Sequence, residues 1–534
     1  MKYSIIGIGL VAFGLFFFGC SSGRDAAVNV LQAGNGAEVQ ELDPHVVSGV
    51  SENRVLSALF EGLTDINPAT LEPMPAIAHA WTVSDDGLVY TFQLRENARW
   101  SNGAPVTAGD FAYAWQRILS PNLASEYAYL LYCLKNARLY HEGRLADFSE
   151  VGVRVLDTHT LEARLEHPTP YFLAMQNHSA WLPVHPPTIE QYGAMDERGT
   201  QWTRPGRLVS NGPFMLTAWR PNEILRVRRN PEYWDADAVR LEGIDFHPID
   251  NQQTEERSFR SGMLHITSTI PLHRVEVYRR DRPEVLNLHP YYGSYYYRLN
   301  VTRPPFDNPL VRKAFALSLD RDELARHVLT GDEQPAASYV PQGDGRHEPI
   351  TRIAFDVGKA RALLAEAGYP DGRGLPTVEI LYNTSEAHRT IAEAVQRMWR
   401  ENLNADVRLL NQDWKVYLSS MNNLDYDIAR SGWIGDVADA INFLECFQTD
   451  VGNNRTGWSS PEYDALIAAA YTERDVERRT RLLQEAEALL LDGGPIIPIY
   501  FYTWKFLQAP ELGGLIPNIL GYIRWKDLYL EGEV

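Results

Sequence analysis

No Gly/Ser-rich or Pro-rich linker interrupts this sequence of 534 residues. A chain of this length is too long for one ordinary hydrophobic core, and length alone predicts roughly three or four domain-sized units. Domain boundaries commonly fall in flexible linkers of that composition. Their absence predicts lobes joined by short crossing strands, with the chain passing between lobes more than once. Ligands of such proteins are expected in the cleft between the lobes.

Alternating apolar residues indicate strands in the first half of the chain. Tyr90, Phe92 and Leu94 alternate with polar residues, a pattern typical of a half-buried strand. Thr107 followed three residues later by Asp110 predicts the start of a helix, because these side chains satisfy free backbone N–H groups there. The region is therefore expected to mix helices and strands.

The second half of the chain alternates strands with helices. Asp356 is expected to cap a helix, and strands predicted at 378–383 and 405–412 flank a helix predicted over 391–403. Another helix is predicted over 476–491. This order of elements indicates a mixed α/β lobe with parallel strand pairing.

The composition is that of a folded globular protein, with 45% hydrophobic and 22% charged residues. The net charge of -19 argues against nucleic acid as a partner, because neutralising phosphates needs a concentrated basic face. The acidic balance mainly favours solubility.

The first twenty residues, MKYSIIGIGLVAFGLFFFGC, predict export from the cytoplasm. One basic residue precedes an apolar run at 5–18, which is shorter than the roughly 20 residues needed to span a bilayer. The run ends in Gly-Cys and resembles a bacterial lipoprotein signal, in which residues 1–19 are removed and Cys20 is lipidated. A plain secretory signal with an incidental cysteine is the alternative. Either way, we expect the mature chain in the periplasm or at the cell surface.

Two further cysteines, Cys133 and Cys446, are expected in a compartment where disulfides form. They either pair or lie separately as buried apolar residues. Sequence alone does not distinguish these alternatives.

The spacings that enzyme chemistry requires are missing from the sequence. It holds no HExxH, paired CxxC, GxSxG or phosphate-binding Gly-Lys-Ser/Thr motif. His178 and His185 lie among prolines and tryptophan, which favours structural or surface roles over metal ligation. The adjacent Glu255 and Glu256 are expected on a solvated face or turn rather than as paired acids. We therefore predict no catalytic residue, no metal and no cofactor.

Five tyrosines gather in HPYYGSYYYRLN, residues 289–300. Tyrosine suits strands, so the segment is compatible with a core strand. Tyrosine also lines adaptable binding clefts, because it offers a flat apolar face and a hydroxyl. Both interpretations stay open.

Six segments, in order and across nearly the whole mature chain, carry a resemblance to the family 5 extracellular solute-binding proteins. Within the family the likeness is greatest to the oligopeptide binders that feed ABC importers, with dipeptide and murein-peptide binders as near relatives. The segments are LRENARWSNGAPVTAGDFAYAWQRILSP (94–121), SNGPFMLTAWRPNEILRVRRNPEYWD (210–235), RKAFALSLDRDEL (312–324), LLAEAGYPDG (363–372), ARSGWIGDVAD (429–439) and NNRTGWSSPEYDALI (453–467).

The resemblance implies an α/β fold of the type II periplasmic-binding-protein kind, a clamp of two mixed α/β lobes with an additional third lobe. It also implies a non-enzymatic monomer whose partners are short peptides and the permease subunits of an ABC transporter. The implied limits are 20–60, 187–292 and 503–534 for lobe I, 61–186 for the extra lobe II, and 293–502 for lobe III.

The same resemblance assigns roles to residues near the end of lobe III. Asp436 would receive the α-ammonium group of a peptide, because a buried carboxylate is stable only with a hydrogen-bonded cation. Gly432 would admit the peptide backbone, and Trp433 would wall a side-chain pocket. The peptide would add as a strand, so that main-chain bonds supply affinity without demanding a sequence.

Further positions carry over from the family with less defined roles. Arg430 corresponds to an arginine that meets the carboxylate of short peptides, and His388 to one that serves longer peptides. A structural role for either residue stays open. The other matching positions are Gly49 and Val50 in a backbone-pairing segment, Tyr127 as a clamp residue, and Trp414 and Tyr502 in the lining.

The chain departs from the family at four cleft positions. Gly293 and Ile434 stand where the oligopeptide binders have a disulfide, which is therefore absent. Met421 replaces an arginine, and Arg298 replaces a glutamate that follows the tyrosine run. These changes alter the charge of the cleft and leave the preferred peptide open.

The sequence is therefore interpreted as a lipid-anchored receptor that captures short peptides and delivers them to a membrane permease. A relative that binds murein tripeptide, dipeptide or another small ligand is the nearest alternative. A peptidase or glycosidase, and a purely structural envelope lipoprotein, are the alternatives from other classes.

Overall fold

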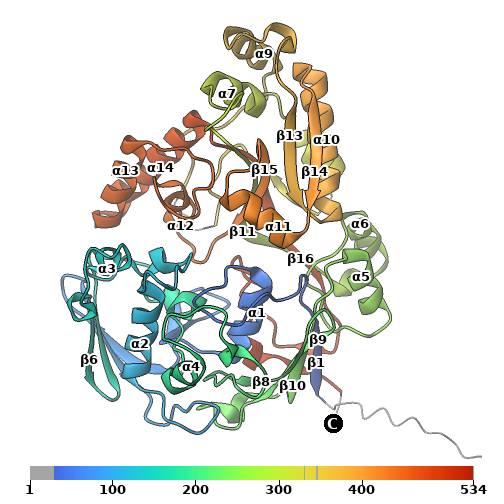
Figure 1. Ribbon diagram of the computed structural model, residues 1–534. Coiled ribbons are helices and arrows are strands. Elements are labelled where there is room, and N and C mark those ends of the chain that lie inside the picture. The colour runs from blue at the N-terminus through green and yellow to red at the C-terminus, as the bar shows by residue number, and fades with distance from the viewer. Residues whose placement is uncertain (1–28, 330, 344–346, 533–534) are drawn as a thin grey trace, which may run out of the picture.

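Three sheets form the framework of the computed structural model, which describes residues 29–329, 331–343 and 347–532 (Figure 1). We call them the base sheet, the side sheet and the upper sheet. The base sheet has the order β1-β10-β9-β8, with β1 parallel to β10 and the other pairs antiparallel. Its strands and nearby helices are β1 (Val30–Gly34), β8 (Phe214–Arg220), β9 (Ile224–Arg229), β10 (Gly243–His247), α1 (Val50–Leu59), α5 (Gln252–Arg260) and α6 (Leu272–Asp281).

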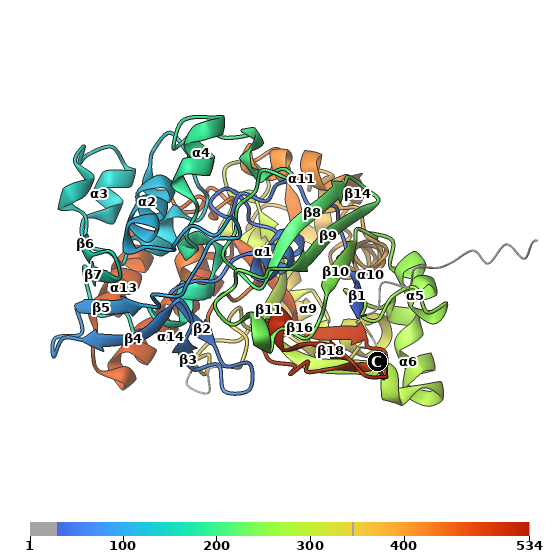
Figure 2. The ribbon, with the colours of Figure 1, turned by 90° about the horizontal axis from the view of Figure 1, so that it is seen from below.

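The side sheet is antiparallel, in the order β4-β5-β7-β6, and lies beside α2 (Figure 2). The predicted strand is β5, and its inward residues Tyr90, Phe92 and Leu94 are buried. The predicted capping box of α2 is present between Thr107 and Asp110. Both predictions are confirmed. The elements here are β2 (Thr64–Ile66), β3 (Pro73–Pro75), β4 (Ala78–Val83), β5 (Val89–Leu94), α2 (Ala108–Leu119), α3 (Ala137–His141), β6 (Val153–Asp157), β7 (Thr160–Arg164) and α4 (Pro186–Tyr192).

The upper sheet is mixed, in the order β12-β16-β11-β15-β13-β14, and helices lie around it in Figure 1. The predicted parallel pairing is confirmed between β13 and β14. Its strands are β11 (Leu286–Leu299), β12 (Gln334–Pro335), β13 (Val378–Asn383), β14 (Val407–Gln412), β15 (Ile428–Ile434) and β16 (Ile496–Leu507). Its helices are α7 (Pro309–Leu317), α8 (Arg321–Leu324), α9 (Val357–Glu366), α10 (Glu386–Leu403), α11 (Trp414–Asn422), α12 (Ile441–Leu444), α13 (Pro461–Thr472) and α14 (Val476–Gly493). Near the C-terminus, β17 (Leu512–Gly513) pairs with β18 (Tyr529–Leu530).

Two of the three helices predicted in the upper sheet region, α9 and α14, begin at the predicted residue, and α10 does not. The Asp356 side chain accepts a hydrogen bond from the Lys359 N–H at the start of α9, as predicted. Helix α10 begins at Glu386 rather than at Ile391. Its first turn carries no large apolar residue, so the hydrophobic periodicity begins only at Ile391.

The strands β11 and β16 join the upper sheet to the base of the molecule. They pair antiparallel from Leu286–Leu507 to Arg298–Ile496. Tyr295 and Tyr297 pack in the core of the upper sheet, whereas the other end of the ribbon packs against α5 and α6. The pairing shifts between Pro290 and Ser294, so the chain bulges there. Strands crossing between lobes are what the linker-free sequence predicts.

The tyrosine cluster lies on β11 and is mainly a core strand. Tyr292, Tyr295, Tyr296 and Tyr297 are each at most 1% exposed. Tyr291 lines the large cavity described below. The two interpretations of this segment therefore apply to different residues.

Two expectations about buried polar residues have definite outcomes. Cys133 and Cys446 are both free and buried, so they lie separately as apolar residues. The solvated position expected for Glu255 and Glu256 is wrong, because α5 turns both side chains inward. Ser268 donates two hydrogen bonds to Glu255 (2.7 and 2.8 Å), and burial raises the pKa of this carboxyl to about 7.

A buried arginine ties the N-terminal segment to α2. Arg117 donates to both carboxylate oxygens of Asp43 (2.8 and 2.6 Å), to Nδ1 of His45 (3.0 Å) and to the Met195 carbonyl (2.7 Å). His45 Nε2 lies 3.1 Å from the Leu182 carbonyl, so the neutral ring donates there and accepts from Arg117. Burial, followed by the charge of Arg117, lowers the pKa of His45 to about 4.

This neutral histidine predicts a pH-dependent stability. In the folded protein the pKa of His45 lies below its ordinary 6.5. Between pH 6.5 and pH 4, His45 is therefore protonated in the unfolded chain but not in the folded one. The free energy of unfolding falls as the pH falls through that window. The loss attributable to His45 is up to roughly 3 kcal/mol. Chemical denaturation at pH 7 and pH 4.5 measures it, and a His45→Gln variant should show a shallower decrease than wild type. His79→Gln, at an exposed position, is the control; equal slopes in all three proteins would contradict the assignment.

Candidate functional site

A cavity of about 570 Å³ lies between the base of the molecule, the side sheet region and the upper sheet. This volume is in the range of small-molecule binding sites. All ten residues predicted as ligand contacts line it, although they come from widely separated parts of the chain. They are Gly49, Val50, Tyr127, His388, Trp414, Arg430, Gly432, Trp433, Asp436 and Tyr502.

Strand β15 presents a free edge to this cavity. On one side it pairs with β11 along its whole length, from Ile428–Leu299 to Ile434–Gly293. On the other side the ladder with β13 ends at Ala429. Within the residues that the structure describes, no strand pairs with positions 430–434 on that side.

The hydrogen-bonding groups of this edge point into the cavity. Gly435 N–H donates to the Tyr292 carbonyl (2.7 Å), and hydrogen-bonded pairs recur at every second residue of an antiparallel ladder. The N–H and C=O groups of Gly432 and Ile434 therefore point away from β11. An extended chain in the cavity has two such residues to pair with.

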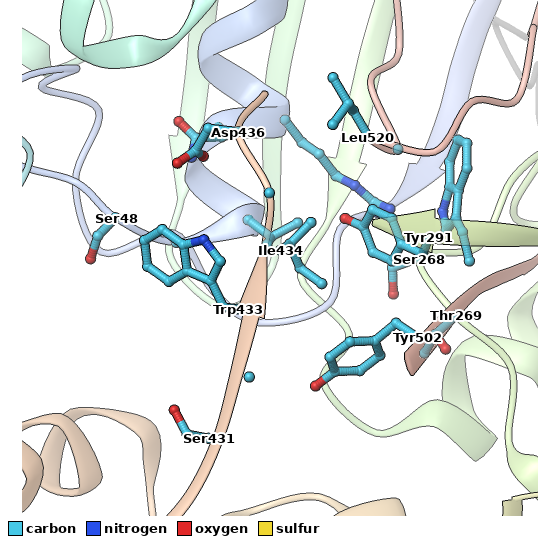
Figure 3. A pocket seen from close by; sticks show the side chains of 18 of the residues that line it. Ser48, Ser268, Thr269, Tyr291, Ser431, Trp433, Ile434, Asp436, Tyr502 and Leu520 are labelled. Atoms are coloured by element: carbon cyan, nitrogen blue, oxygen red, sulfur yellow. The ribbon is translucent and has the colours of Figure 1, made fainter. Parts of the chain in front are cut away.

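Asp436 lies just beyond the end of β15, half-buried and next to the open edge (Figure 3). Its backbone N–H donates to Asn442 Oδ1 (2.8 Å), and Asn442 Nδ2 donates to its Oδ2 (3.4 Å). Nearby Asp439 forms two short contacts with Arg479 (2.8 and 3.0 Å). The two carboxylates of this motif thus differ: Asp439 has a guanidinium partner and Asp436 has none.

His178, which belongs to the side sheet region, approaches Asp436 across the cleft. Its Nε2 lies 3.3 Å from Asp436 Oδ1, close enough for electrostatic attraction but not aligned as a hydrogen bond. The Ala180 N–H donates to Nδ1, so a neutral ring carries its proton on Nε2, facing the carboxylate. The sequence analysis gave His178 a structural or surface role and did not place it beside Asp436, because only folding brings 178 and 436 together.

Packing gives a further reason for the missing side chain at Gly432, beside the expected approach of a peptide. A Cβ at this position would lie 2.6 Å from the hydroxyl oxygen of Tyr502. Tyr502 therefore occupies the space in which a side chain at position 432 would lie. A peptide that pairs with β15 would approach from a different direction, along the strand edge. Tyr502 in turn accepts a hydrogen bond from Arg430 (2.8 Å).

The backbone-pairing segment at Gly49 and Val50 is not a strand. Gly49 is the extended N-cap residue of α1, and Val50 is the first helical residue, with 52% of its surface exposed.

Two aromatic side chains lie near Asp436. Trp433 donates a hydrogen bond from its indole N–H to Asn442 (3.3 Å). Tyr127 packs edge-on against His178, with ring centroids 4.8 Å apart. Both aromatic residues therefore wall the cavity close to Asp436.

Arg430 and His388 lie on the same side of β15. Arg430 forms no ion pair with any described residue, and its Nε has no hydrogen-bond partner. Burial, with the charge of Arg430, lowers the pKa of His388 well below its ordinary value. His388 is therefore neutral and offers a hydrogen bond rather than a charge to a carboxylate. Trp414, at the start of α11, stacks on Tyr417 at 5.5 Å.

The two family cysteine positions are filled by close packing. Gly293 and Ile434 are directly opposed in the β11–β15 ladder. A Cβ on Gly293 would lie only 2.4 Å from Ile434 Cδ1. The isoleucine side chain therefore occupies the space that a cross-strand disulfide would need.

The described residues contain no cluster of three or more His, Cys, Asp or Glu side chains placed to hold a metal ion. Across the same residues, no helix is both long and apolar enough to cross a membrane. The predicted lipid attachment site, Cys20, lies outside the described residues.

The family model for bacterial extracellular solute-binding proteins, family 5 Middle, matches residues 72–455. Among curated relatives, the oligopeptide-binding protein OppA of Bacillus subtilis is 37% identical over 504 residues, which covers 92% of this chain and 90% of that protein.

Solved structures agree in fold. The Escherichia coli murein tripeptide binding protein MppA superposes with a TM-score of 0.90 at 34% identity, covering 95% of this chain and 99% of that one. Haemophilus influenzae OppA in complex with the peptide RPPGFSPFR gives 0.88 at 33% identity, covering 94% and 99%. The unliganded open form of MppA gives only 0.67 at 33% identity, covering 95% and 98%. The lobes here are thus arranged differently from that open form.

The architecture is accordingly that of the type II periplasmic binding proteins, with mixed α/β sheets on either side of a cleft. The predicted fold class is confirmed. The chain belongs to the bacterial extracellular solute-binding proteins of family 5, the non-enzymatic substrate-binding components of ABC transporters.

Proposed function

We propose that this protein captures short peptides through their free α-amine and backbone and delivers them to the permease of an ABC importer. The observation that carries the proposal is Asp436, a cleft carboxylate that no described Lys or Arg pairs with, at the end of an open strand edge. An extended peptide antiparallel to β15 would place its ammonium group there and pair with Gly432 and Ile434.

The other end of such a peptide would lie near Arg430. This guanidinium is half-buried, is held by Tyr502 and lacks an ion-pair partner among the described residues. A carboxylate would form an ion pair with this guanidinium, and two parallel hydrogen bonds between them would fix the end of a short ligand. Asp436 and Arg430 would thus match the two termini of a peptide.

The structure has features of a closed clamp. Glu126, from the side sheet region, pairs with Arg455 (3.2 Å), and Gln253 of α5 donates to Glu386 of α10 (2.9 and 3.0 Å). Opening would break these surface contacts while leaving β11 and β16 intact. We propose the bulge at 291–293 as the hinge, because the paired strands lose their regular register there.

We further propose lobe limits of 20–60, 187–292 and 503–534 for lobe I, 61–186 for lobe II and 293–502 for lobe III. Residues 1–19 are proposed as the cleaved leader, with Cys20 as the lipid attachment site that anchors a monomeric receptor outside the cytoplasm. A murein peptide is the second candidate ligand, since the likeness to MppA is as high as that to the OppA proteins.

Thermal shifts on residues 21–534, stripped of ligand by unfolding and refolding, test the function. Di- to hexapeptides with a free amine should stabilise the protein. A ligand at about 100 times its dissociation constant adds roughly 2.7 kcal/mol. N-acetylated copies should give little shift, because they lack the cation that Asp436 requires. If no free peptide or murein tripeptide shifts the melting temperature, the peptide assignment fails.

Replacing Asp436 tests the amine contact directly. Asp436→Asn should weaken free-amine peptides by about tenfold or more, since it removes the charge that pairs with the ammonium group. Isothermal titration calorimetry measures the change. Asp439→Asn is the matched control, because Asp439 pairs with Arg479 and does not line the cavity. Equal affinities of the Asp436→Asn variant and wild type would remove Asp436 from the site.

Gly432→Ala tests the packing behind the strand edge. The new Cβ would displace the Tyr502 hydroxyl, which holds Arg430, so peptide affinity should fall by about tenfold. Gly452→Ala is the control, because nothing lies within 4 Å of a Cβ at that position. Unchanged affinity in the Gly432→Ala variant would show that the position of Tyr502 does not matter for binding.

A further inference from the structure

The cavity lining holds more positive than negative side chains. Its carboxylates are Glu126 and Asp436, and its cations are Arg54, Arg298, Arg430, Arg455 and Lys505. Lys505 is neutralised by an ion pair with Glu333. A peptide with one amine and one carboxylate adds no net charge, so it would leave this imbalance in place. Buried charges without counter-charges are costly.

Arg298 is the most enclosed of these cations. It is 3% exposed and donates to the Ser431 hydroxyl (3.0 Å), the Asn453 carbonyl (2.6 Å) and the Tyr296 hydroxyl (3.0 Å). All three acceptors are uncharged. Among described residues Arg298 has no ion pair, and a guanidinium has five N–H donors. It therefore keeps donor capacity and an unmatched charge at the cavity wall.

A second guanidinium increases the positive charge at this wall. Arg455 pairs with Glu126 (3.2 Å), whose side chain is 42% exposed, while its own Nε is buried without a partner. Burial, followed by the charge of Arg298, lowers the pKa of Arg455. The two arginines thus repel each other, and only Arg455 is paired with a carboxylate, the partly solvated Glu126.

The position of these arginines relative to β15 decides what they would contact. Side chains alternate between the two faces of a strand. Figure 3 shows Ser431 and Trp433 on one side of β15 and Tyr291 and Tyr502 on the other. Arg298 donates a hydrogen bond to the Ser431 hydroxyl, so its side chain lies on the face of β15 opposite to Tyr502. A peptide paired with the edge would send every second side chain onto this face.

We propose that Arg298 and Arg455 form a subsite for a second carboxylate of the ligand, and that this protein prefers peptides with an acidic residue inside the chain. The inference rests on the proposed peptide-binding function. It matches three ligand charges to three cavity groups: the amine to Asp436, the terminal carboxylate to Arg430 and the internal carboxylate to Arg298. Either an Asp or Glu side chain or the free carboxylate of a γ-linked glutamyl residue supplies the third charge.

Calorimetry with tripeptides tests this preference in the wild-type chain from residue 21 onward. Ala tripeptides with Glu, Gln or Lys at each position in turn cover every register. At one position, Glu should bind about tenfold tighter than Gln, as expected for a charge-assisted pair, and Lys should bind worst. A tripeptide with a γ-linked D-glutamate in the middle carries its free carboxylate on the α-carbon. If it binds tighter than the tripeptide with an ordinary Glu in the middle, the subsite takes an α-carboxylate; if it binds more weakly, the subsite takes a side-chain carboxylate.

Variants assign the effect to Arg298. Arg298→Gln should reduce the ratio between Glu and Gln peptides to about one, and Arg298→Glu should reverse it in favour of Lys. Arg312→Gln is the matched control, because Arg312 is also buried but donates to the Gly493 and Phe306 carbonyls away from the cavity. It should keep the wild-type ratio even if it lowers the melting temperature.

The possible results distinguish failure of the acidic subsite from failure of the proposed peptide-binding function. Equal binding of Glu and Gln peptides at every position, or a preference that survives in Arg298→Gln, would overturn the acidic subsite and leave a peptide receptor in place. Binding of no tripeptide at all would instead overturn the proposed function.

Discussion

The antiparallel ribbon of β11 and β16 is the constraint on which the binding site depends. Its lower end packs with α5 and α6, and its upper end lies in the core of the upper sheet. Because β15 pairs with β11 along its whole length, the ribbon sets the position of every group that β15 presents to the cavity. The same two strands carry Tyr291, Arg298 and Tyr502. One backbone ladder thus supports the strand edge and both side-chain walls.

The cleft gathers several charged side chains that lack an oppositely charged Lys, Arg, Asp or Glu partner among the described residues. Elsewhere, some buried ions are paired, as Arg117 is with Asp43 and Asp439 is with Arg479, whereas Arg312 is held by backbone carbonyls. In the cleft, Asp436 has no Lys or Arg partner, and Arg430 and Arg298 have no carboxylate partner, among the described residues. Such an arrangement costs stability in the empty protein. A ligand of complementary charge removes that cost, so the unpaired groups favour ligands whose charges match theirs.

The sequence predicted the fold class and most of the elements because these depend on local patterns and a resemblance that spans the chain. The caps at Thr107 and Asp356 are examples of local chemistry that sequence shows directly. Contacts between distant segments were harder. His178 reaches Asp436, and α5 turns Glu255 toward Ser268, only after the chain has folded. Arg298 was visible as a departure from the family, but its hydrogen-bond partners and its distance from carboxylates are set only by the folded chain.

The packing of Ile434 against Gly293 has a consequence for how the protein matures. The sequence has three cysteines, and the two in the described part of the chain are free and buried. No covalent bond therefore ties β11 to β15, and the cleft is assembled by noncovalent contacts alone. Its assembly should be independent of thiol oxidants and disulfide isomerases. The ligand-binding part of this receptor should thus reach its active form as readily in a reducing cytoplasm as outside the cell.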